Sequence, residues 1–154
     1  MKFNLGNAII FLTCMVLGTT ACNINRPCDE PTQFPILSGF YDSIGADTTL
    51  AGLTIFGIGR EDSLLADMDT LHSVSLPLNP FTDTSRFVMT FGPVADTLSF
   101  MYQRNLRMVN PECGFAMYFQ IETINHTHNF IDSLILLDQY LDANAQEHLQ
   151  IFVH

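Results

Sequence analysis

The stretch that decides the fold is Phe115-Ala116-Met117-Tyr118-Phe119-Gln120-Ile121-Glu122. Large apolar side chains alternate in it with smaller or more polar ones, which is the pattern of a β-strand with one buried and one wetter face. Cys113 has the same parity as Phe115, so extending the strand backwards predicts that its sulfur faces the core. Three other segments alternate in the same way, and their apolar members are Phe87, Met89 and Phe91; Leu98, Phe100 and Tyr102; and Leu149, Ile151 and Val153.

Further apolar segments at residues 36–41, 53–58, 74–78 and 131–137 are also candidate strands. The last is an almost unbroken apolar run, which predicts a place near the middle of a sheet. Leu64, Leu65, Met68 and Leu71 favour strand plus loop over a helix, and turn signals such as Asn79-Pro80, Gly92-Pro93 and Asn110-Pro111 separate the segments. We predict an all-β fold, an antiparallel β-sandwich of the immunoglobulin-like or Greek-key type with about eight strands, with a small barrel as the alternative.

The N-terminal residues predict the cellular location of the protein. An apolar run from Ala8 to Gly18 follows Lys2 and ends at Thr19-Thr20-Ala21-Cys22. The run is shorter than the about 20 residues of a membrane-spanning helix and is typical of a signal peptide. We interpret residues 1–21 as a lipoprotein signal peptide, Cys22 as the lipidated residue, residues 22–33 as a tether and residues 34–154 as the β-sandwich domain. An ordinary secretory peptide is the alternative.

Charge limits the partners. Without residues 1–21 the chain holds five arginines, no lysine and sixteen acids, a net charge of 5 − 16 = −11. Nucleic acid is excluded as a partner, because phosphate binding needs clustered cations. Attraction to anionic lipid head groups is excluded for the same reason, so membrane attachment must come from the lipid.

If Cys22 is acylated, Cys28 and Cys113 are left as a pair, and an oxidising compartment permits a disulfide between them. Such a bond would stabilise the fold by about 4 kcal/mol through its long loop. Two unpaired buried thiols are the alternative.

Signs of catalysis are weak. His126-Thr127-His128 places two imidazoles on one face of an extended strand, but no third zinc ligand is marked, although His72, His148 or Glu122 would serve. Asp67-Met68-Asp69 faintly resembles a calcium loop. The sequence contains no G-x-S-x-G, S-x-x-K or H-E-x-x-H motif. We therefore expect no enzyme, no catalytic residues, no metal and no cofactor.

Asp followed by Ser or Thr and then an aliphatic residue or Thr recurs six times. Turn-capping aspartates before strands explain such a pattern. It also resembles the O-glycosylation acceptor sequence of Bacteroidetes-type bacteria, and Asn125-His126-Thr127 matches an N-glycosylation sequon. The candidate O-glycosylation residues are Ser43, Thr48, Ser63, Thr70, Thr97 and Ser133.

Nearly the whole mature chain resembles an uncharacterised family of Bacteroidetes-type cell-envelope lipoproteins, a domain of unknown function. The segments that carry the resemblance are Cys22, Cys28, Leu53-Thr54-Ile55-Phe56-Gly57-Ile58-Gly59, Ser75-Leu76-Pro77-Leu78, Asp96-Thr97-Leu98-Ser99-Phe100, Glu112-Cys113-Gly114-Phe115 and Glu147-His148-Leu149-Gln150-Ile151-Phe152. The resemblance implies a lipid-anchored β domain and supports the pairing of the two cysteines. It assigns no catalytic residue, and it suggests an outer-membrane barrel protein as a partner.

We expect a non-catalytic binding or structural module of the cell envelope, anchored by lipid at the periplasmic face of the outer membrane and contacting an outer-membrane or periplasmic protein through a strand edge or loops. A carbohydrate or small-ligand binding module is the alternative, with Tyr118 and Phe152 as outward aromatics that would stack on sugar. A hydrolase with an unrecognised pair of carboxylates is a third hypothesis.

Overall fold

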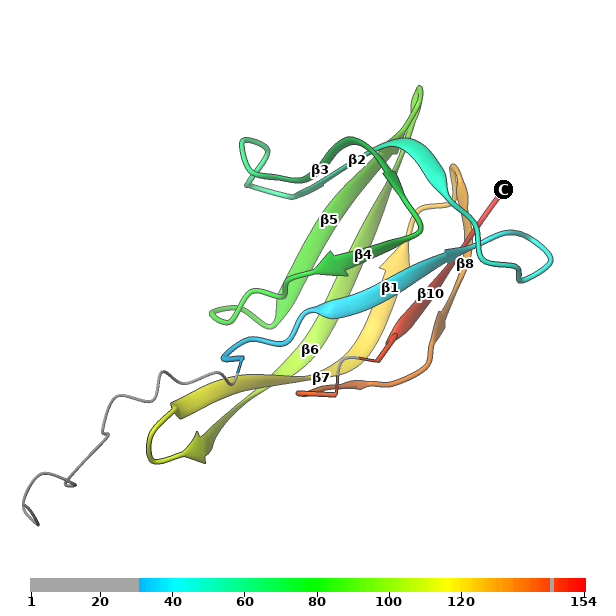
Figure 1. Cartoon of the computed structure of the whole chain (residues 1–154). Helices are drawn as coiled ribbons and strands as arrows, with labels where there is room; N and C mark the ends of the chain where they lie inside the picture. The colour runs from blue at the N-terminus through cyan, green and yellow to red at the C-terminus, as the bar shows by residue number, and fades with distance from the viewer. Residues whose placement is uncertain (1–30, 145) are drawn as a thin grey trace, which may run out of the picture.

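The computed structural model describes residues 31–144 and 146–154, and this part of the chain is all-β. Its ten strands are β1 (Ile36–Tyr41), β2 (Leu50–Gly57), β3 (Leu64–Leu71), β4 (Ser73–Leu76), β5 (Thr84–Phe91), β6 (Val94–Asn110), β7 (Gly114–His126), β8 (Ile131–Leu136), β9 (Tyr140–Leu141) and β10 (Leu149–Val153). They form two sheets, ordered β4-β1-β10-β8 and β3-β2-β5-β6-β7-β9, which pack face to face without closing into a barrel (Figure 1). The predicted β-sandwich is confirmed. No helix in the described residues is long and apolar enough to cross a membrane.

Strand pairing is antiparallel, as predicted, except between β1 and β10. These two strands run parallel, with Phe40 opposite Ile151. A hairpin turn would impose the antiparallel direction, but β1 and β10 are joined through the rest of the sandwich. The short strand β9 was not predicted, and β3 was predicted only as strand plus loop, so the ten strands exceed the predicted number of about eight.

The core lies between the two sheets and is rich in aromatic rings. Tyr102 and Phe119 meet edge to face with their ring centroids 5.3 Å apart, and Phe87 meets Phe100 in the same way at 6.0 Å. Such pairs add to the free energy gained from burial alone. The apolar members of three predicted alternations are buried or half-buried as expected, namely Phe87, Met89, Phe91, Leu98, Phe100, Tyr102, Leu149, Ile151 and Val153.

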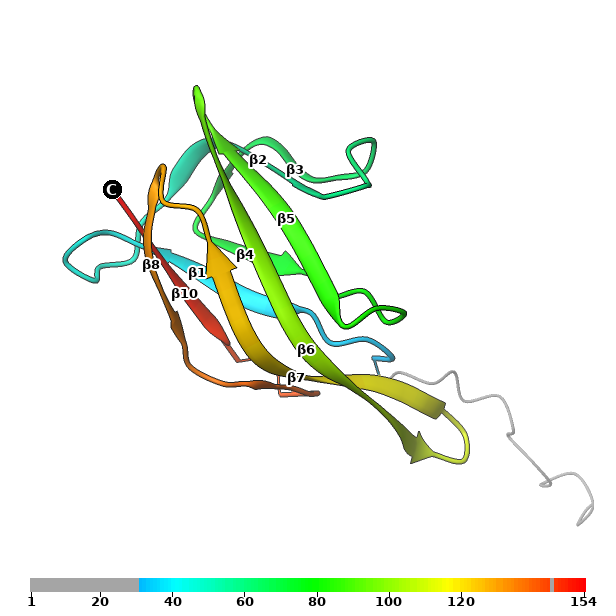
Figure 2. The same cartoon turned by 180° about the vertical axis from the view of Figure 1, so that it is seen from behind.

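The buried face predicted for residues 115–122 is confirmed only in part. Phe119 and Ile121 are in the core, but Phe115 is exposed and Ala116 is buried instead. Phe115 is exposed because β6 and β7 continue past the other strands as a two-stranded ribbon, which Figure 2 shows from behind. We call residues 106–117 of this ribbon the arm. Cys113 lies half-buried in its end turn, not in the core as predicted.

The position predicted for residues 131–137 is wrong. This segment contains β8, which pairs only with β10 and forms an edge of its sheet. Ile135, Leu136 and Leu137 are exposed. An unbroken apolar run is typical of a central strand, but here the neighbour on one side is solvent.

The corner between β7 and β8 is held by Asp96, whose side chain is fully buried. Its carboxylate accepts hydrogen bonds from the backbone N–H groups of Asn129, Phe130 and Ile131 at 2.7–3.0 Å and from the hydroxyl of Thr127 at 2.5 Å. One side chain on the six-stranded sheet thereby fixes the chain as it crosses to the other sheet.

Candidate functional site

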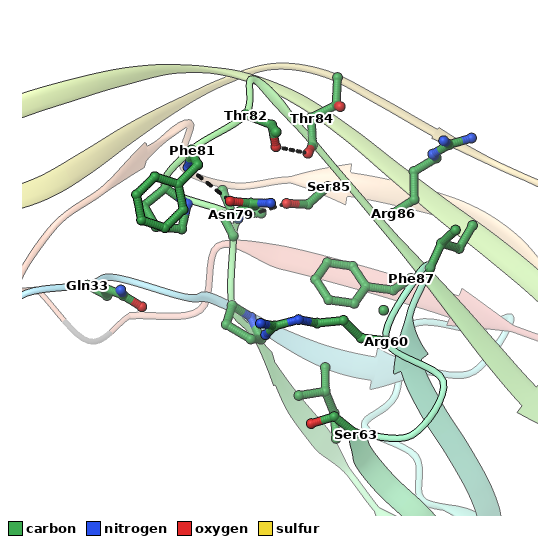
Figure 3. A pocket seen from close by; sticks show the side chains of 16 residues that line it. Gln33, Arg60, Ser63, Asn79, Phe81, Thr82, Thr84, Ser85, Arg86 and Phe87 are labelled. Carbon is green, nitrogen blue, oxygen red and sulfur yellow. Dashed lines mark hydrogen bonds between the residues drawn. The ribbon is translucent and has the colours of Figure 1, made fainter.

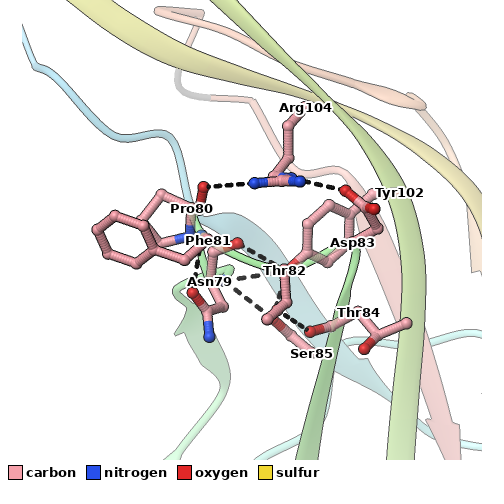
Figure 4. Close-up of polar contacts among 9 residues, drawn as sticks. All are labelled: Asn79, Pro80, Phe81, Thr82, Asp83, Thr84, Ser85, Tyr102 and Arg104. Carbon is pink, nitrogen blue, oxygen red and sulfur yellow. Dashed lines mark hydrogen bonds and ion pairs between the residues drawn. The ribbon is translucent and has the colours of Figure 1, made fainter.

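The loop between β4 and β5 is held by several side-chain hydrogen bonds, and it is fixed from beneath by Tyr102. The ring of Tyr102 is buried, and its hydroxyl lies 2.7 Å from the hydroxyl of Ser85. The same oxygen donates to the carbonyl of Asn79 at 2.9 Å and accepts from the Asn79 N–H at 3.1 Å (Figure 4). The base of the loop therefore has a single conformation set by the core.

The outer half of the loop is held by side chains as well. Asn79 Oδ1 accepts the N–H of Phe81 at 2.9 Å. Arg104 on β6 reaches across with its Nε 2.6 Å from the Asp83 carboxylate and its Nη1 3.1 Å from the carbonyl of Pro80. An exposed ion pair contributes little to stability by itself, but these contacts select one shape for the loop.

Phe81 lies at the tip of this loop, and 84% of its surface is exposed. Exposure of so large a ring is unfavourable in water, and here it is imposed by a rigid loop. The side chain borders a groove of about 570 Å³. This volume lies within the range of small-molecule sites.

The groove runs between the β4–β5 loop and the turn that joins β2 to β3 (Figure 3). Arg60 and Ser63 come from the turn, Phe87 from β5, and Gln33 from the segment before β1. In the close-up the side chain of Arg60 extends across the groove below the ring of Phe87. Its sixteen lining residues are Gln33, Gly57, Ile58, Arg60, Ser63, Leu65, Pro77, Leu78, Asn79, Pro80, Phe81, Thr82, Thr84, Ser85, Arg86 and Phe87.

The groove is locally positive in a strongly acidic protein. Two arginines line it and no carboxylate does. The nearby carboxylate of Glu61 accepts the N–H of Gly59 at 2.8 Å, and this hydrogen bond lowers the pKa of Glu61. Among the described residues Arg60 has no ion-pair partner. The arrangement can bind a planar or anionic group, and it lacks the paired carboxylates of a glycosidase.

The histidines do not assemble a metal centre in the described residues, where no group of three metal-binding side chains occurs. The rings of His126 and His128 meet edge to face, 4.2 Å apart. His148 is buried, and its Nδ1 accepts the N–H of Leu37 at 3.2 Å. Burial lowers the pKa of His148, against the opposing pull of Asp138 and Asp142.

Asp67 and Asp69 lie on β3, where the N–H of Asp67 donates to Asp69 Oδ2 at 3.3 Å. Met68 between them has a φ of 53° at an irregularity in the pairing of β2 with β3. The segment is an irregular edge strand.

The structure separates the candidate glycosylation residues by exposure. Ser43, Ser63, Thr70 and Ser133 are exposed, whereas Thr48 and Thr97 are half-buried. Thr97 follows the buried Asp96 and donates its N–H to Thr127 at 2.9 Å. At this copy of the motif the aspartate has a structural role, and modification stays a prediction at all six.

Cys22 and Cys28 lie outside the described residues, so lipidation and the disulfide also stay predictions. Cys113 itself lies in the end turn of the arm, where its N–H donates to Asn110 Oδ1 at 2.6 Å. The chain approaches the arm close to its described beginning. The carbonyl of Thr32 accepts the N–H of Met117 at 3.2 Å, and Gln33 pairs with Met117 in a parallel bridge.

The aromatics predicted to stack on sugar have partners. Tyr118 packs on Phe34 with a centroid distance of 4.8 Å and lies under Arg107, while Phe152 packs on Tyr41 at 5.6 Å. Phe81 is the better platform, and sequence reasoning missed it. The available signal was a phenylalanine directly after the turn dipeptide Asn79-Pro80.

Comparison with known proteins gives one match. A family model described as a family of unknown function (DUF6452) covers residues 52–153. No curated protein matches the chain, and no solved structure matches it.

Proposed function

The chain belongs to the family of unknown function DUF6452, and from that premise we propose a non-catalytic binding module that lipid on Cys22 holds at the cell envelope. The observation that carries the binding role is Phe81, which a rigid loop keeps exposed beside a groove. Aromatic side chains on preordered loops dominate the free energy of many interfaces, because little conformational entropy is lost on binding.

The anchor is supported by the short apolar run before Cys22 and by the compact domain that follows it. Two or three acyl chains on one cysteine give stable attachment, whereas the acidic surface gives none. We infer the Bacteroidetes type of lipoprotein and the periplasmic face of the outer membrane from the residues that carry the family resemblance.

The disulfide between Cys28 and Cys113 is supported by the register of the chain beside β7. Gln33 pairs in parallel with Met117, an offset of 117 − 33 = 84 residues. Gln33 is five residues from Cys28 in the sequence, and Met117 is four residues from Cys113. We therefore propose that the tether is linked to the arm at Cys113.

The partner we propose is a neighbouring envelope protein that receives Phe81 in an apolar pocket, with the groove accepting one of its side chains. Truncation of such an anchor weakens binding by tenfold or more, which is about 1.4 kcal/mol or more. Ile44 offers a matched control, since it is 88% exposed on the β1–β2 loop.

The test is cross-linking of intact cell envelopes followed by capture of the full acylated protein. The wild type and the Ile44→Ala variant should carry the same cross-linked partner, and the Phe81→Ala variant should lose it. A wild-type protein that always runs alone would contradict the proposal, as would equal capture by both variants.

A carbohydrate or small-ligand site is the second candidate, favoured by Arg60 and by the absence of carboxylates among the lining residues. An acidic sugar would stack on Phe81 and bind its carboxylate to the guanidinium. Thermal-shift screening against neutral and acidic oligosaccharides tests this, because a bound ligand raises the melting temperature. Loss of the shift in the Arg60→Ala variant would assign it to the groove.

A further inference from the structure

We propose that the arm is a second point of membrane contact, which lays its apolar face on the lipid bilayer beside the anchor. This inference rests on the proposed acylation of Cys22. It adds an interaction surface and a partner, the lipid surface, to a protein whose net charge argues against electrostatic attachment.

The arm carries a continuous apolar face. Leu106, Met108 and Phe115 are 63%, 58% and 59% exposed. Met108 is directly opposite Phe115, and Leu106 is directly opposite Met117. Directly opposed residues share a face of a ribbon, as do residues two apart on one strand. These four side chains therefore lie on one face.

This face is the outward continuation of the core. Tyr102 and Phe119, which are buried between the two sheets, have the same orientation on β6 and β7. The second sheet covers them but does not extend over the arm, as both views of the ribbon show (Figures 1 and 2). The sequence of a buried strand thus continues where the described part of the second sheet offers no covering layer.

The position of the tether decides what covers the arm. Thr32 is hydrogen-bonded to Met117 at the base of the arm. Ten residue steps separate Cys22 from Thr32, so the acylated sulfur lies within about 33 Å of the arm. With the disulfide formed, six steps separate Cys22 from Cys28, and the end of the arm lies within about 20 Å of the anchor. The bilayer that holds the acyl chains of Cys22 is therefore an apolar surface within reach of the arm.

The charge distribution permits the contact. Residues 104–118 contain Arg104, Arg107 and a single acid, Glu112. The acidic β1–β2 loop, with Asp42 and Asp47, lies at the opposite end of the sandwich (Figure 1). An arm that points towards the bilayer therefore keeps this acidic loop away from anionic head groups.

The absence of tryptophan from the sequence gives a clean test. The Phe115→Trp variant places one fluorophore on the arm, and the Phe81→Trp variant places one on an exposed loop outside the arm. Both full-length acylated proteins are reconstituted in phosphatidylethanolamine and phosphatidylcholine vesicles with brominated acyl chains. We expect the arm fluorophore to shift to shorter wavelength and to be quenched about twofold more than the loop fluorophore, as at an interfacial depth of about 5–10 Å.

The outcomes separate this inference from the proposed function. A protein that does not float with the vesicles overturns both the anchor and the arm contact. A floating protein with equal quenching at the two positions overturns the arm contact alone. A blue shift without bromine quenching overturns it as well, because the arm is then covered by protein.

Discussion

Asp96 shows how one buried carboxylate can remain charged. Burial raises its pKa, but the hydrogen bonds from Phe130, Thr127, Ile131 and Asn129 outweigh that effect and lower the pKa below its ordinary value. A carboxyl group with a lowered pKa in the folded state contributes stability above its unfolded pKa near 3.9. That contribution is lost as the pH falls through the folded pKa.

We predict that Asp96→Ala lowers the free energy of unfolding by about 3 kcal/mol, because several buried donors lose their acceptor. Asp96→Asn should cost less, since one amide oxygen still accepts. Urea unfolding measures both, with Asp62→Ala on an exposed copy of the motif as a control expected within about 0.5 kcal/mol of wild type. The difference between wild type and Asp96→Ala should narrow below about pH 4. A constant difference down to pH 2 would contradict the charged role.

At the scale of elements, β8 and the arm have one property in common. Each exposes apolar side chains that no neighbouring element of the described chain covers. Natural edge strands are usually protected by charges, prolines or bulges. In β8 the charge of Asp132 is at the start, and the three apolar residues Leu134 to Leu136 follow after Ser133. The bulge between β8 and β10 is also at this start, near Phe152.

We predict that Ile135→Lys reduces self-association without loss of stability. Ile135 is opposite Gln150, away from the buried face, so its replacement should change the free energy of unfolding by about 0.5 kcal/mol or less. Light scattering against concentration measures the effect. Ile44→Lys adds the same charge away from any edge, and equal suppression by that variant would attribute the effect to net charge.

For the whole molecule, the important constraint is how the N-terminal segment joins the sandwich. The contacts of Thr32 and Gln33 with Met117 place the end of the predicted tether at the arm. A link from Cys28 to Cys113 would make the arm part of the anchor.

We predict that peptide mapping without reduction finds Cys28 joined to Cys113 in the exported protein. Cys113→Ser should lower the free energy of unfolding by about 4 kcal/mol, because the crosslink closes a loop of 113 − 28 = 85 residues. Cys28→Ser should have the same effect, and the double variant should cost no more than either single one. Unequal or additive losses would indicate other partners.

The sequence by itself determined where the strands lie and, within the sandwich, which side chains face the core. These features follow from the period-two alternation, which is local: Leu98, Phe100 and Tyr102 are buried for that reason. The alternation carries no information about the neighbours of a strand. Only the tertiary structure decided that β8 is an edge, that Phe115 lies beyond the second sheet, and that Tyr102 and Arg104 hold Phe81 in solvent. Each depends on contacts between residues distant in the chain, and such contacts decide which apolar surface is left for a partner or a membrane.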